Sequence, residues 1–148
     1  MTAMSPESSG MPEKIRIFSV DEANATLELV VPIIEQLQGL QQSVVDVDQQ
    51  LEVTQHKLTA GNGYPIQELK QQAAQLTNRR AHLVEAYKSA LEQLAGLGCL
   101  LKDLQKGLID FYAMHDGDLV FLCWHLGEDR IRFWHDVEDG FAGRQPLT

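Results

Sequence analysis

The chain has 148 residues, 44% of them hydrophobic, and a net charge of −9, values that fit one globular domain with its own core. The acidic balance excludes the basic patch that supplies most nucleic-acid affinity, and it disfavours an anionic membrane surface. No segment approaches the roughly 20 apolar residues of a membrane span. We therefore expect a cytoplasmic protein with a disordered leader at 1–14 and a single α+β domain at 15–148.

The first predicted element is a long antiparallel helical hairpin at about residues 19–97. Ser19 and Glu22 form a capping box that marks its start. Pro32 removes a helical hydrogen bond at a cost on the order of 3 kcal/mol, so it predicts a kinked first helix or two helices that meet there. Apolar residues then recur at alternating steps of four and three, a spacing typical of a coiled coil: Ile33, Leu37, Leu40, Val44, Val47, Leu51 and Leu58, with Thr54 as the polar member.

The hydrophobic period changes after the hairpin, at about residues 98–148. Strand-like runs on both sides of Asp116-Gly117 give the strongest short hairpin signal, and the pattern predicts an antiparallel β-meander of three or four strands. The segment Gly140–Pro146 is rich in Gly and Pro and is interpreted as a tail.

The Asp-Gly turn predicts the register of the first two long strands, with Asp110 opposite Cys123. A second turn centred on Gly127-Glu128 would place Arg132 opposite Cys123. One face of this sheet is apolar and should pack on the helices. The other face carries Asp110, Cys123 and Arg132 beside an aromatic row, and it is too apolar to be solvated. We expect a partner subunit, a ligand or the tail with Phe141 to cover it; the aromatic row is Tyr112, Phe121 and Trp134.

The same face supplies candidate ligand-binding residues, which are Asp110, Cys123, His125, Arg132, Trp134, His135 and Arg144. A cation beside Cys123 would lower its thiol pKa and a carboxylate would raise it. The alternative, an ordinary cross-strand ion pair between Asp110 and Arg132, is favoured. Arg144 follows a Gly-Phe-Ala-Gly run, and we expect it to pair with Asp110 or Glu128 or to hold an anionic ligand.

A metal site is a second alternative, because possible ligands stand close in sequence: Cys123, His125, Glu128 and His135. The predicted register puts His135 on the face opposite Cys123 and His125. We therefore expect no metal and no cofactor, although a one-residue bulge near Gly127 would reverse that face.

Several motifs taken together resemble a bacterial domain-of-unknown-function family, the one numbered 2203. They are Phe18–Asn24, Gly107–Phe111, Leu122–Glu128, Phe133–His135 and Gly140–Arg144. The resemblance runs from about Phe18 to Leu147. It implies a bacterial protein with no established activity, and it provides no catalytic residues.

The sequence favours a non-enzymatic interaction or scaffold domain that forms a homo-oligomer, without nucleic acid or membrane as a partner. The alternative is a small-ligand- or metal-binding domain, in which the Asp110/Cys123/Arg132 face works with His125 or His135.

Overall fold

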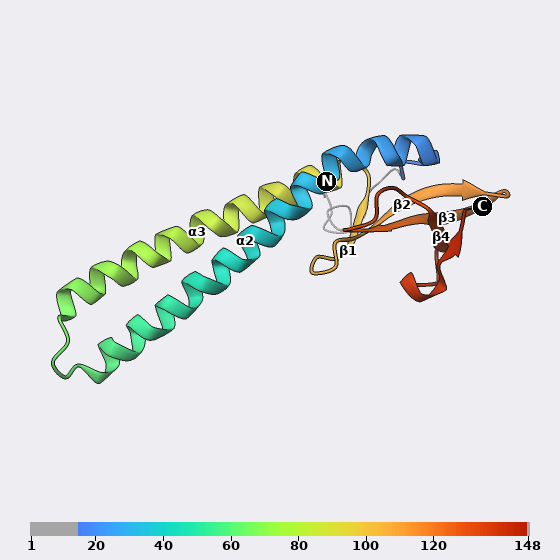
Figure 1. Cartoon of the computed structure of the whole chain (residues 1–148). Coiled ribbons are helices and arrows are strands. Elements are labelled where there is room, and N and C mark those ends of the chain that lie inside the picture. Colours follow the sequence, from blue (N-terminus) through green and yellow to red (C-terminus); the bar gives the residue numbers. More distant parts are fainter. Residues whose placement is uncertain (1–14, 148) are drawn as a thin grey trace, which may run out of the picture. The chain divides into compact units, whose positions relative to one another are not determined.

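The computed structural model describes residues 15–147, so the predicted leader at 1–14 lies outside the described residues. Two long helices are followed by an antiparallel sheet, which confirms the α+β class (Figure 1). The chain divides into two compact units. The hairpin unit is Pro32–Gln93, and the sheet unit comprises the chain up to Val31 and from Leu94 onward. Within the described part of the chain, no helix combines the length and apolar character needed to cross a membrane.

Helix α2 spans Val20–Ala60, and its first turn is closed by the predicted capping box. The amide of Glu22 donates to Ser19 Oγ at 3.0 Å, and the amide of Ser19 donates to Glu22 Oε1 at 2.9 Å. Pro32 lies inside α2 without ending it, so the alternative of two separate helices is wrong. A helix that is already nucleated can lose one hydrogen bond and continue. The proline instead marks the boundary between the two units.

The hairpin unit pairs α2 with α3, which spans Ile66–Gly96. A salt bridge joins the helices, with Arg80 Nε 2.6 Å from Asp48 Oδ1. Arg80 of α3 therefore contacts α2 directly through an exposed ion pair. Six of the 62 residues in this unit are buried, and they are Ile34, Leu37, Val47, Thr54, Leu69 and Ala90.

The sheet has five strands in sequential order. They are β1 Leu100–Asp103, β2 Leu108–His115, β3 Asp118–His125, β4 Phe133–Asp136 and β5 Gln145–Pro146, with a 3-10 turn η1 at Phe141–Gly143. The prediction of three or four strands missed β5, which was interpreted as tail. Proline is tolerated in a strand at the edge of a sheet, where its missing N–H breaks no ladder hydrogen bond, and β5 is such an edge strand.

The predicted register between β2 and β3 is confirmed at every pair, including Asp110 opposite Cys123. The turn between these strands has positive φ at both central residues, 52° at Asp116 and 86° at Gly117. A type I′ turn requires this geometry, and its twist matches that of the strands it joins.

The predicted register between β3 and β4 is wrong by one residue. Cys123 faces Phe133 instead of Arg132, and Phe121 faces His135 instead of Trp134. The connecting loop is longer than a turn at Gly127-Glu128 would allow. Its contacts explain the shift, because the amide of Ile131 donates to Asn24 Oδ1 at 2.8 Å and holds the loop against α2. A one-residue shift moves every β4 side chain to the opposite face.

The first face of the sheet packs against the start of α2 and forms the core of the sheet unit. The ring of Phe18 contacts Phe111 at 4.9 Å between centroids, and the amide of Phe18 donates to the carbonyl of Tyr112 at 2.8 Å. The strand residues buried on this face are Ile109, Phe111, Ala113, Val120, Leu122 and Trp124. The second face is buried as well at Phe121 and Cys123, so these residues need no partner subunit to cover them.

Candidate functional site

Three side chains from three neighbouring strands converge on the second face of the sheet. Asp110 lies on β2, Cys123 on β3 and His135 on β4. One carboxylate oxygen, the thiol sulfur and one imidazole nitrogen lie within 4.8 Å of one another. All three residues are buried. We refer to them as the triad.

His135 is held at both ring nitrogens. Its Nδ1 lies 2.8 Å from the carbonyl oxygen of Asp136, and its Nε2 lies 3.2 Å from Asp110 Oδ2. A carbonyl oxygen only accepts, so Nδ1 carries a hydrogen and donates it. Nε2 is then the ring nitrogen that faces the Asp110 carboxyl group.

Burial raises the pKa of the other two members of the triad. It raises the pKa of Asp110, and the hydrogen bond and charge of His135 only partly oppose that effect. Burial also raises the pKa of the Cys123 thiol to about 12, and the neighbouring Asp110 adds to the shift. Cys123 is therefore a neutral thiol at physiological pH. The triad is consequently a poor nucleophilic site, because the thiolate is the reactive form of cysteine.

The predicted register places Arg132 beside Asp110 and Cys123, but in the structure Arg132 does not join them. It is exposed and pairs with Asp129, with Nη2 3.1 Å from Oδ2. Trp134 also leaves this face, and its ring lies 4.4 Å from that of His115. The cation that could have activated the thiol is thus absent from its predicted position opposite Cys123. His135, which lies opposite Phe121 where Trp134 was predicted, is the β4 side chain that contacts Asp110.

Arg144 forms the ion pair with Glu128 that was one of its two predicted pairings. Its Nη2 lies 2.7 Å from Glu128 Oε2, and both side chains are 14% exposed. The guanidinium lies over two rings, 4.0 Å from the centre of Phe133 and 4.4 Å from that of Phe141. Its Nε is buried and has no hydrogen-bond partner among the described residues. The segment interpreted as a tail is therefore tied to the sheet.

His125 lies beside this ion pair. Its backbone amide donates to Glu128 Oε1 at 2.9 Å, and its ring Nδ1 lies 2.9 Å from the carbonyl of Leu126. The imidazole Nε2 is 3.7 Å from Glu128 Oε2. The side chain also borders a shallow surface pocket, which is lined by Gln105, Lys106, Leu108, His125, Leu126 and Phe141.

The metal alternative changes with the corrected register. The four predicted metal ligands are Cys123, His125, Glu128 and His135. Only Cys123 and His135 belong to the triad. The argument that His135 faces away from Cys123 is wrong, because β4 is shifted by one residue. Asp110 is the third donor. The length of the loop 126–132 is the sequence feature that could have warned of this error. A loop of that length does not fix the register of the strands it joins, whereas a two-residue turn does.

The family model described as an uncharacterized conserved protein (DUF2203) matches residues 16–147, nearly the whole chain. The chain belongs to this family. No curated protein and no solved structure matches it. The description of the DUF2203 family states no activity.

Proposed function

We propose that this DUF2203 protein is an interaction domain that self-associates through its hairpin unit, with a second copy of the chain as the partner. The observation that carries the proposal is the thin core of that unit, where six of 62 residues are buried. In the sheet unit, β2 and β3 alone bury nine of their sixteen residues. Two helices bury one seam between them, whereas packing against another helix pair buries a second face.

The surface of the hairpin unit suits a copy of itself. It contains five basic and seven acidic residues, a net charge of −2, while the whole chain carries −9. Two such units therefore repel each other weakly. The unit also holds twelve of the chain's fourteen glutamines. An amide both donates and accepts, so a glutamine-rich surface is complementary to itself, as a two-fold interface requires.

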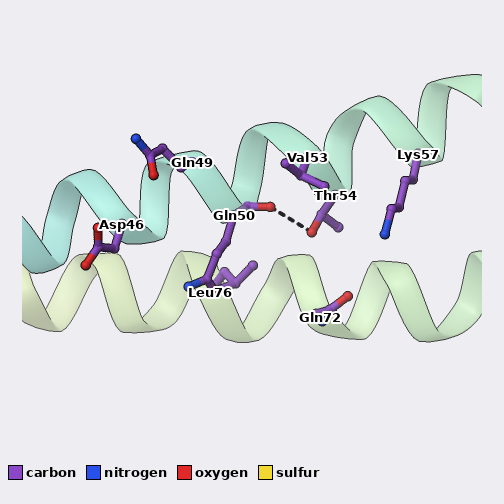
Figure 2. A pocket seen from close by; sticks show the side chains of 8 residues that line it. All are labelled: Asp46, Gln49, Gln50, Val53, Thr54, Lys57, Gln72 and Leu76. Carbon is purple, nitrogen blue, oxygen red and sulfur yellow. Dashed lines mark hydrogen bonds between the residues drawn. The ribbon is translucent and has the colours of Figure 1, made fainter.

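A groove between α2 and α3 is an example of this glutamine-rich surface (Figure 2). Gln49 and Gln50 of α2 and Gln72 of α3 line it, and the picture shows the side chain of Gln50 reaching toward α3. Val53, which is 55% exposed, lines the groove, and Val45, which is 43% exposed, lies about two turns earlier on α2. Packing the groove against a second copy would remove this apolar surface from water.

Charge substitution at the exposed valines tests the location of the interface. In a two-fold dimer the Val53→Glu change places one negative charge on each copy, so two like charges enter the interface. We expect the self-association constant to fall about 100-fold. The helix itself should persist, because glutamate has a higher helix propensity than valine. Sedimentation velocity over a concentration series measures the constant, and circular dichroism verifies the helix content.

Val137→Glu is the matched control. Val137 is 42% exposed and belongs to the sheet unit, so the same change there should leave association unaltered. Equal weakening by both substitutions would indicate a non-specific charge effect. Association that survives Val45→Glu combined with Val53→Glu would rule out this face of the hairpin unit. If a single copy of the chain instead sediments in a complex with a different, co-purified protein, that protein and not a second copy would be the partner.

A second candidate function, small-ligand binding on the sheet unit, is supported by the pocket beside His125 and Phe141. Lys106 and His125 line it. His125 in turn contacts Glu128, which forms the ion pair with Arg144. A small carboxylate or phosphate compound that raises the melting temperature of the wild type, but not of Lys106→Ala, would favour this function.

A further inference from the structure

We propose that Asp110, Cys123 and His135 form a binding site for a divalent transition-metal ion, with zinc as the best match to the donor set. The site lies in the sheet unit and is independent of the self-association proposed for the hairpin unit. Its donors are one carboxylate, one thiolate and one imidazole, the residue types that bind zinc in proteins. Sulfur and imidazole ligands together favour zinc over magnesium or calcium, which prefer oxygen.

The spacing of the donor atoms fits one ion. The three atoms lie within 4.8 Å of one another, and His135 Nε2 is 3.2 Å from Asp110 Oδ2. Ligand atoms around a tetrahedral zinc lie about 3.3–3.8 Å apart, given its usual bond lengths. Movements of about 1 Å or less in side chains would bring all three into range. Neighbouring strands of one sheet supply the donors, so the backbone already fixes their relative positions.

His135 is oriented as a metal-binding histidine is oriented. Such a histidine donates its other ring N–H to a carbonyl or carboxylate, which fixes the tautomer and aims the free nitrogen at the ion. Here Nδ1 faces the carbonyl of Asp136 at 2.8 Å, which leaves Nε2 as the nitrogen that points at Asp110.

Metal binding at this site releases protons. The ion displaces the thiol proton of Cys123 and any proton that Asp110 and His135 share, these protons leave to solvent, and no electron is transferred.

Cobalt substitution tests the site and distinguishes it from adventitious binding. We expect the full-length protein, refolded from denaturant with Co(II), to bind about one equivalent. The complex should show the visible bands of four-coordinate cobalt and the near-ultraviolet thiolate-to-cobalt band. Refolding is used because the triad is buried and the ion needs an open state to enter. Elemental analysis of the protein refolded with zinc and then gel-filtered should give the same stoichiometry.

The two cysteines supply a matched pair of variants. Both are buried, and burial raises each thiol pKa to about 12. Cys123→Ser should remove the thiolate band and weaken zinc binding about 100-fold or more. Cys99→Ser should leave both unchanged. Asp110→Asn should weaken binding while it keeps the thiolate band at high cobalt concentration.

Three results would overturn the assignment. The first is a folded wild-type protein that retains no zinc or cobalt after gel filtration. The second is a thiolate band that survives Cys123→Ser or is lost equally in Cys99→Ser. The third applies if Cys123→Ser fails to fold: wild-type protein whose melting temperature is the same with and without zinc would then exclude a site built into the sheet.

Discussion

Replacement of Arg144 by alanine should destabilise the sheet unit far more than an ordinary loss of a surface charge. Arg144 donates to Glu128 at 2.7 Å, and both side chains are largely buried. A charge-assisted hydrogen bond of this kind contributes about 1.5–3 kcal/mol. The two aromatic rings under the guanidinium add about 0.5–1 kcal/mol each. The rotamer freedom that alanine releases offsets up to about 2 kcal/mol. The expected loss in the free energy of unfolding is therefore about 2 kcal/mol.

Urea denaturation followed by tryptophan fluorescence measures this loss selectively. The chain has two tryptophans, Trp124 on β3 and Trp134 on β4, so the signal reports the sheet unit. With a urea dependence of about 1–3 kcal/mol per molar, the midpoint should fall by roughly 1 M.

Arg132→Ala is the control for this experiment. Its pair with Asp129 is exposed, with side chains 49% and 70% accessible, so its removal should leave the urea midpoint almost unchanged. If Arg144→Ala costs no more than Arg132→Ala, the terminal segment is a loose tail after all. The structural role assigned to its ion pair would then be wrong.

Three further predictions concern the sheet unit. Asn24→Ala should cost about 1–3 kcal/mol in urea denaturation, because the amide of Ile131 loses its acceptor, and a wild-type midpoint would show that this bond does not hold the loop. In the metal-free folded protein, Cys99 and Cys123 should resist alkylation near neutral pH, since burial raises both thiol pKa values to about 12; fast labelling before denaturation would contradict this. Truncation after Gly140 should lower the fluorescence midpoint further than Arg144→Ala, because it also removes β5; an unchanged midpoint would leave β5 without a stabilising role.

Local signals in the sequence were sufficient wherever a few adjacent residues determine the geometry. Ser19 and Glu22 satisfy each other's backbone amides within one turn, so the start of α2 was predictable. Asp116 and Gly117 adopt the positive φ values that a type I′ turn demands, so the whole register of β2 with β3 followed.

Sequence reasoning failed where a contact distant in sequence decides the local structure. The loop before β4 is held by Asn24, which is 107 positions away from Ile131, and no local pattern indicates that bond. The resulting shift removed Arg132 from the position opposite Cys123 and brought His135 to the face that carries Asp110 and Cys123, which changed the chemistry of that face. The strand β5 was missed for a related reason, because its pairing with β4 outweighs the low strand propensity of proline.

Light scattering coupled to size-exclusion chromatography is the most direct test of self-association through the hairpin unit. The full-length chain has a mass of 16.6 kDa. At micromolar concentration we predict a mass of at least two chains, with a dimer as the simplest case. The Val53→Glu variant should shift toward the mass of a single chain. A wild-type mass of 16.6 kDa across the concentration range would contradict the proposed function.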